Sequence, residues 1–344
     1  MKKEALLYEK LPDNKVRCDL CAHRCLIAEN AFGICGVRKN MEGALYSLVY
    51  RNVITANADP IEKKPLYHFL PGSMSFSVAT IGCNFKCGFC QNWEISQLNM
   101  TGAPDYMSRD LAPEAVVAGA VRKNCQSISY TYTEPTVYFE FAYDCARLAK
   151  EKGLFNVFVT NGYMAREAIL LIKPYLDAAN VDLKFLNDAS YRKICKGSLQ
   201  PVLDSIRCMR ESGIWVEVTT LIVPGVNDSA QELSAIAGFL AGVDTSIPWH
   251  ISRFYPHYQM TAQEPTPEET LKKAEEIGRA AGLTYVYAGN VWGWGQDTVC
   301  HSCKKTLVKR EGFSILEYNI DAGACAYCRT RIPGVFADTP HEDG

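Results

Sequence analysis

Runs of apolar, β-type residues alternate with helical stretches through most of the chain, and this alternation restricts the possible folds more than any other feature. The β-type runs cover 75–81, 127–132, 155–160, 180–185, 215–223, 248–254 and 284–289. The helical stretches cover 113–124, 136–153, 166–176, 201–213, 230–242 and 267–282, and several end in glycine, as helices commonly do. Repeated βα units predict an α/β fold in which helices surround a parallel sheet, here a partial or full (β/α) barrel.

Polar residues stand at the ends of successive predicted strands. They are Glu134, Asn161, Asp182, Lys184 and His257. In a (β/α) barrel the carboxyl ends of the strands share one mouth, which carries the active site. We therefore expect these side chains to face one site, although each of them alone is also explained as a turn residue, a strand-end ion pair or a satisfied histidine.

Cysteines are unusually frequent, with fifteen in a chain that has no signal-like apolar start and no apolar run long enough to span a membrane. We expect a cytoplasmic protein, in which disulfides are disfavoured and clustered cysteines indicate bound metal. Three tight groups hold most of them: Cys18, Cys21, Cys25 and Cys35; Cys83, Cys87 and Cys90; Cys300, Cys303, Cys325 and Cys328. The isolated cysteines, predicted to be small buried hydrophobic residues, are Cys125, Cys145, Cys195 and Cys208.

The middle group supplies three thiolates, Cys83, Cys87 and Cys90, in a loop after the first predicted strand. Structural zinc sites and ordinary clusters take four protein ligands, so three would leave one iron of a cubane open to a substrate. The alternative is a zinc site completed by a distant histidine. The segment CNFKCGFC resembles the CxxxCxxC signature of the radical S-adenosylmethionine (SAM) superfamily. That resemblance implies a [4Fe-4S] cluster that binds SAM and cleaves it reductively to a 5′-deoxyadenosyl radical, which abstracts hydrogen from a protein or small-molecule substrate.

Further elements resemble glycyl-radical-enzyme activases such as pyruvate formate-lyase activase. The YTEP segment is similar to a GGEP element, with Tyr and Thr in place of both glycines, and this similarity implies that Glu134 receives the SAM amino group. TNG and DLK are similar to elements that line the SAM ribose and carboxylate, which implies such roles for Asn161, Asp182 and Lys184. ISRFYPH resembles IELLPYH, and this aligns His257 with a SAM-contacting histidine.

The flanking cysteine groups each offer four thiolates to a metal. Two CxxC pairs, CHSC at 300–303 and CAYC at 325–328, have the spacing of a zinc ribbon or a rubredoxin. Zinc is the first choice because it stabilises modules too small to fold alone, whereas a rubredoxin-type iron would make the site an electron entry point. The N-terminal group, with His23 as a possible substitute ligand, predicts either zinc or an auxiliary iron–sulfur cluster.

The predicted organisation is an N-terminal Cys-rich segment (1–70), a radical SAM barrel (71–292) and a C-terminal double-CxxC ribbon (293–344). The combination resembles the radical SAM component of the AmmeMemoRadiSam system, which implies AMMECR1-like and Memo-like partners, and reductive cleavage requires an electron donor such as flavodoxin or ferredoxin. Basic and acidic residues balance, 36 against 38, so charge predicts neither nucleic acid nor membrane as a partner. The competing hypothesis is a non-enzymatic metal-ribbon adaptor or electron carrier. A Rossmann-type methyltransferase is disfavoured because the first strand leads into cysteines rather than a glycine-rich loop.

Overall fold

One large sheet organises the molecule in the computed structural model, which describes residues 1–100 and 108–336. Its strand order is β16-β15-β14-β13-β12-β11-β9-β8, with β8 antiparallel to β9 and every other pair parallel. The strands are β8 (Thr55–Pro60), β9 (Met74–Ala79), β11 (Ser127–Tyr130), β12 (Phe155–Thr160), β13 (Ala178–Asp182), β14 (Trp215–Ile222), β15 (Trp249–Arg253) and β16 (Val286–Gly289). Because β8 and β16 do not pair with each other, the sheet has two edges and forms a partial barrel.

Helices follow the strands as the sequence predicts. The longer ones are α2 (Pro113–Arg122), α3 (Phe139–Glu151), α4 (Arg166–Ile172), α6 (Gln200–Glu211), α7 (Ala230–Val243) and α8 (Glu268–Ala280). The short ones are α1 (Trp93–Ser96) and α5 (Asp188–Ser190), with 3-10 turns at η1 (Ile61–Lys63) and η2 (Pro135–Tyr138) and a π-helical turn at η3 (Tyr191–Cys195). The α/β fold class is therefore confirmed. Among the described residues, none of the helices has the length and apolar character needed to cross a membrane.

The core lies on both faces of the sheet, as expected for parallel strands covered by helices. All four residues of β11 are buried, and α3 turns an apolar face, including Phe141 and Ala146, toward the strands. The isolated cysteines Cys125, Cys145, Cys195 and Cys208 are all buried, as predicted.

Two small antiparallel sheets form the N-terminal part. One contains β1 (Lys3–Glu4), β6 (Ala44–Ser47) and β5 (Arg38–Met41), and the other contains β2 (Tyr8–Lys10), β3 (Val16–Cys18) and β4 (Leu26–Ile27). A further pair joins β7 (Asn52–Val53) to β10 (Arg109–Asp110). This part contacts the loop after β12. Cys21 forms an isolated antiparallel β-bridge with Met164, and the Ala165 amide donates a hydrogen bond to the Leu20 carbonyl at 3.0 Å. It therefore lies at the carboxyl ends of the parallel strands.

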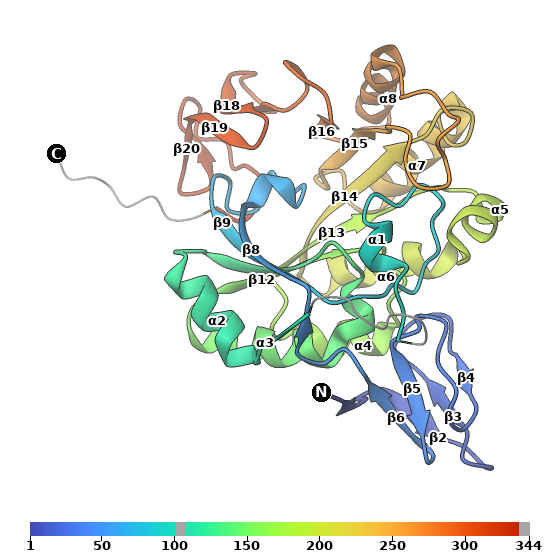
Figure 1. Cartoon of the computed structure of the whole chain (residues 1–344). Helices are drawn as coiled ribbons and strands as arrows, with labels where there is room; N and C mark the ends of the chain where they lie inside the picture. Colours follow the sequence, from blue (N-terminus) through green and yellow to red (C-terminus); the bar gives the residue numbers. More distant parts are fainter. Residues whose placement is uncertain (101–107, 337–344) are drawn as a thin grey trace.

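The C-terminal ribbon contacts the opposite end of the sheet. It consists of β17 (Thr298–Val299), β18 (Thr306–Glu311), β19 (Ser314–Tyr318), β20 (Ile320–Asp321) and β21 (Ala324–Cys325). The chain beyond it pairs with the segment before β9, because the Leu70 amide donates to the Val335 carbonyl at 2.7 Å and the Val335 amide to the His68 carbonyl at 2.8 Å. The red ribbon and the blue N-terminal sheets accordingly lie on opposite sides of the large sheet (Figure 1).

Candidate active site

The cysteine loop connects β9 to α1 and carries Cys83, Cys87 and Cys90. Cys87 is buried, and the other two are partly buried. The Phe85 amide donates to Cys83 Sγ at 3.4 Å, and Cys90 Sγ lies 3.2 Å from Ser96 Oγ. Donors of this kind stabilise a thiolate and tune a metal centre that it binds.

The sulfurs of this loop are not spaced for a single ion. Among residues 1–100 and 108–336, the set of metal-ligand atoms that all lie within 4.8 Å of one another is found elsewhere, in the C-terminal ribbon. The thiolates of a cubane bind different irons and must stand farther apart than thiolates that share one zinc. Cys83, Cys87 and Cys90 therefore fit a polynuclear cluster better than the zinc alternative.

Glu134 is buried and caps the turn η2, in the loop that follows β11. Its Oε1 accepts hydrogen bonds from Thr136 N (3.1 Å), Thr136 Oγ1 (2.6 Å) and Thr160 Oγ1 (2.7 Å), and its Oε2 accepts from Asn161 N (2.8 Å). Burial raises the pKa of Glu134, and these donors oppose that rise. The side chain thus holds the ends of β11 and β12 in register, and its expected contact with the SAM amino group stays a prediction.

Tyr132 stands where the similar GGEP element has a glycine. It adopts φ +65°, a left-handed conformation that glycine takes without strain and that a tyrosine rarely adopts. Its hydroxyl reaches Asp59 Oδ2 at 2.5 Å and Lys64 Nζ at 3.3 Å. This anchor on β8 and η1 offsets the cost of the conformation.

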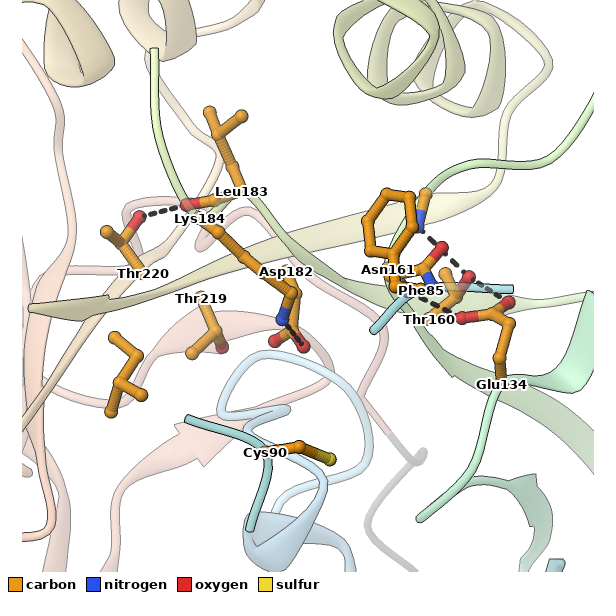
Figure 2. Close-up of polar contacts among 12 residues, drawn as sticks. Phe85, Cys90, Glu134, Thr160, Asn161, Asp182, Leu183, Lys184, Thr219 and Thr220 are labelled. Carbon is orange, nitrogen blue, oxygen red and sulfur yellow. Dashed lines mark hydrogen bonds and ion pairs between the residues drawn. The ribbon is translucent and has the colours of Figure 1, made fainter. Parts of the chain in front are cut away.

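Asn161 directly follows β12 and connects the end of that strand to the cysteine loop. Its Nδ2 donates to Asn84 Oδ1 at 2.7 Å and lies 3.7 Å from Cys83 Sγ, while its Oδ1 accepts from the Tyr163 amide at 2.9 Å. The predicted residue therefore lies beside a predicted cluster ligand. Figure 2 shows Glu134, Thr160 and Asn161 as one connected group.

Asp182 and Lys184 form an ion pair at the end of β13, with Oδ2 and Nζ 2.7 Å apart. The ammonium also lies 5.7 Å from the centre of the Phe89 ring, on the cysteine loop. Burial alone would lower the pKa of Lys184, but the Asp182 carboxylate and the nearby Cys87 and Cys195 thiols raise it well above its ordinary value. Lys184 thus offers a positive charge and Asp182 a hydrogen-bond acceptor next to the cysteines, opposite the Glu134 group (Figure 2).

His257 is exposed and lies in a loop that closes on the cysteine loop. The Gln259 amide donates to the Gly88 carbonyl at 3.0 Å, and the rings of Tyr258 and Trp93 stack with centres 4.9 Å apart. The segment that carries His257 therefore contacts the cysteine loop, and a SAM contact by the imidazole stays a prediction.

Three residues of the site could not be predicted from motifs. Asn84 links the cysteine loop to Asn161, Ser96 contacts Cys90, and Cys195 contacts Cys87 through its thiol and Lys86 through its carbonyl. The sequence signals that pointed to them were weak: Asn84 is adjacent to a motif cysteine, and Cys195 was an isolated cysteine.

The C-terminal cysteines form a single-ion site. Cys300 and Cys328 have their sulfurs 3.7 Å apart, as do Cys303 and Cys325, and all four lie within 4.8 Å. Tetrahedral coordination at a Zn–S distance of about 2.3 Å requires sulfurs about 3.8 Å apart. Hydrogen bonds with Thr330 lower the pKa of Cys328 to about 6, which favours the thiolate that a metal binds. The predicted grouping is thus confirmed as one that can bind a metal ion.

The N-terminal cysteines also come together, but around a cavity. Cys18, Cys21, Cys25 and Cys35 line it, as does His23. His23 Nε2 lies 2.8 Å from the Asn84 carbonyl, to which it can only donate, so that nitrogen is not available as a metal ligand.

Comparison with known proteins agrees with this geometry. A model of the radical SAM superfamily matches residues 77–237, which contain the cysteine loop and the strand ends from β11 to β14. The chain belongs to the radical SAM superfamily, whose members cleave SAM by a radical mechanism, and it is therefore an enzyme. Over nearly its whole length it is similar to the uncharacterized protein MJ0808 of Methanocaldococcus jannaschii, with 45% identity over 335 residues that cover 96% of this chain and 98% of the relative.

Other matches are more distant. The putative glycyl-radical enzyme activating enzyme MJ1632 of the same organism is 26% identical over 209 residues, which cover 60% of this chain and 77% of that protein. The crystal structure of a radical SAM methyltransferase from Sphaerobacter thermophilus shares the fold, with a TM-score of 0.50 and 18% identity over 64% of this chain and 67% of that one. The prediction of a radical SAM enzyme is confirmed, and the adaptor hypothesis is not supported; the narrower assignment to the AmmeMemoRadiSam system stays a prediction.

Proposed function

We propose that Cys83, Cys87 and Cys90 hold a [4Fe-4S] cluster and that the strand ends around them hold SAM. When both are bound, the cluster supplies one electron, and SAM yields methionine and a 5′-deoxyadenosyl radical that takes a hydrogen atom from the substrate. The observation that carries this proposal is the placement of three motif thiols, which are not among the sets that converge on a single ion in the described residues, between Asn161 and the Asp182–Lys184 pair. No fourth thiol is supplied by the CxxxCxxC motif itself.

The chain's own residues divide the work of binding. Lys184 offers a positive charge to the SAM carboxylate, and Asp182 offers acceptors to the ribose hydroxyls. Asn161 positions the cysteine loop through Asn84, and Glu134 fixes the β11 and β12 ends that carry the backbone donors. His257 lies on the loop that contacts Gly88, and a SAM contact by its imidazole is part of the proposal.

The substrate class follows from the relatives only as a proposal. Activating enzymes abstract hydrogen from a protein, and one relative carries the name of a putative glycyl-radical enzyme activating enzyme. We infer a protein or small-molecule hydrogen donor, an electron donor such as flavodoxin or ferredoxin, and AMMECR1-like or Memo-like proteins as partners. The proposal of these partners rests on the family resemblance and not on any surface of the described residues.

The test is SAM cleavage by the anaerobically reconstituted full chain with dithionite, measured as 5′-deoxyadenosine by chromatography. Replacement of Cys83, Cys87 or Cys90 by Ala removes a ligand and should reduce 5′-deoxyadenosine to the background level. Cys125→Ala is the matched control, because Cys125 is buried and lies outside both the motif and the cysteine loop, and this variant should retain cleavage. Cleavage that survives all three motif substitutions would contradict the assignment of the three ligands.

A further inference from the structure

The N-terminal part carries a second buried site at the same mouth of the sheet. Its cavity is lined by Cys18, Cys21, Cys25 and Cys35 from the N-terminal sheets and by Asn84, Thr136 and Val137 from the barrel. Gly33 lies against two of these thiols, since a Cβ at that position would be in ordinary van der Waals contact, 3.9 Å, with both Cys25 Sγ and Cys35 Sγ. The four thiols therefore line one cavity, two of them (Cys18 and Cys35) buried and two (Cys21 and Cys25) partly buried.

The four thiols around this cavity are not one of the sets that converge on a single ion in the described part of the chain. In the described part of the chain, the ribbon cysteines are the set that converges within 4.8 Å, and no three ligand atoms of the N-terminal group do so. One tetrahedral zinc requires sulfurs about 3.8 Å apart. Four thiolates on different irons of a cluster do not share this restriction.

Buried nitrogen donors without partners also line the cavity. Arg38 has an exposed side-chain fraction of 2%, and its Nη2 donates to Glu140 Oε2 at 2.5 Å, but its Nε and Nη1 have no partner. Asn84 Nδ2 is likewise buried and without a partner, although the Asn84 Oδ1 accepts from Asn161. Buried polar groups are nearly always satisfied, so several unpaired N–H groups in one cavity indicate a missing acceptor. Inorganic sulfides and thiolates of a cluster are acceptors of that kind.

We infer that Cys18, Cys21, Cys25 and Cys35 hold an auxiliary iron–sulfur cluster, with Arg38 and Asn84 donating to its sulfur atoms. Asn84 directly follows Cys83, so the residue that lines this cavity is the chain neighbour of a ligand to the SAM cluster. The N-terminal cavity and the cysteine loop are thus connected through two adjacent residues.

The test removes the SAM cluster first. A full-length variant with Cys83→Ala, Cys87→Ala and Cys90→Ala is reconstituted anaerobically with iron and sulfide, and its iron, acid-labile sulfide and zinc are measured with Mössbauer and EPR spectra. We expect at least about two irons and as many sulfides per chain, as in a [2Fe–2S] or [4Fe–4S] cluster. Zinc without sulfide in this variant would overturn the inference.

A second variant assigns the ligands. Adding Cys18→Ser and Cys35→Ser should remove that remaining iron and sulfide, whereas adding Cys208→Ala, which removes a buried cysteine of α6, should leave both in place. Iron and sulfide that survive the first pair would also overturn the inference. The sulfide content of the parent variant is informative even where the added serines prevent folding. Because that parent lacks the motif cysteines, these results are independent of whether the intact enzyme cleaves SAM.

Discussion

Lys184 is the residue whose surroundings most directly suggest a ligand contact. Its ammonium pairs with Asp182 and lies near the Phe89 ring, so it has a fixed position beside the cysteine loop. The family resemblance predicted that this strand-end pair would be at the site, whereas the alternative was an ion pair with a purely structural role. The structure shows that the residues pair and that they also face the cysteines, so the two interpretations are compatible.

Lys184→Met should weaken SAM binding. A hydrogen bond to a charged group contributes about 1.5–3 kcal/mol, and its loss corresponds to a Kd about ten- to a hundredfold higher. The measurement is the SAM-dependent change in the EPR spectrum of the reduced cluster as a function of SAM concentration. Lys152→Met changes an exposed lysine beyond α3 and should leave the Kd unchanged. Equal Kd values for both variants would show that Lys184 only supports Asp182.

Elements with a strong period were predictable, and elements defined by distant contacts were not. The parallel strands and the longer helices follow from apolar periodicity and glycine-terminated helices. Strand β8 was not predicted because its sequence, TANADP, has neither an alternation of apolar and polar residues nor large apolar side chains. It lies within the predicted N-terminal segment 1–70, whereas in the structure it pairs in the large sheet. Its register depends on pairing with β9, and Pro60 at its end fits an edge strand. The start of α3 was placed too early, since Pro135 and the Glu134 cap produce the 3-10 turn η2 first.

The segment 66–70 connects the ribbon to the sheet and has few sequence signals of its own. The Tyr67 and His68 amides donate to the Glu217 carboxylate of β14 at 3.0 and 2.8 Å. The His68 ring is fully buried, with Nδ1 2.7 Å from the Pro333 carbonyl and Nε2 2.6 Å from the Tyr287 hydroxyl. A carbonyl can only accept, so Nδ1 carries the proton of a neutral ring and Nε2 accepts from Tyr287.

His68 should make the fold less stable in acid. Burial lowers the pKa of His68 to about 4 from 6.5, against an opposing effect of Glu217. Above pH 6.5 the His68 ring is neutral in both the folded and the unfolded protein. As the pH falls below 6.5, the unfolded chain binds a proton at this ring while the folded protein does not. The free energy of unfolding therefore decreases until about pH 4, by about 3 kcal/mol in total. His68→Gln should therefore show a smaller loss between pH 6.5 and 4 in urea unfolding, whereas His257→Gln, at an exposed position, should follow the unmodified protein. An unchanged slope in His68→Gln would assign the acid sensitivity to another group.

At the scale of the whole molecule, the sequence predicted which cysteines group together but not what each group binds. Spacing along the chain fixes the number of ligands, whereas the identity of the metal depends on how far apart the sulfurs stand and on which donors surround them. Those features come from contacts such as Asn84 with Asn161 and Arg38 with Glu140, which join residues 77 and 102 positions apart. No local pattern contains such information.

The position of the ribbon also bears on its metal. The ribbon packs through segment 66–70 on Phe155, Ala178 and Trp215, the first residues of β12, β13 and β14. The cysteine loop lies at the other end of the strands, and β14 has eight residues, which span about 25 Å at about 3.3 Å each. The ribbon site and the cysteine loop thus lie at opposite ends of the sheet, a placement that suits a structural metal and agrees with the expectation of zinc.

Removal of the ribbon metal should therefore reduce stability without changing the chemistry. Arg310 ties the ribbon to the barrel, since its Nη2 donates to the Tyr67 carbonyl at 3.0 Å and its guanidinium lies 3.7 Å from Glu62, with both side chains fully buried. Cys303→Ser with Cys328→Ser should lower the free energy of unfolding by a few kcal/mol, as loss of a structural metal does. Hydrogen exchange should increase first at 67–70 and 333–335, while 5′-deoxyadenosine formed per intact cluster should stay constant. A variant that keeps its stability but takes up electrons more slowly would instead require a redox-active iron in the ribbon.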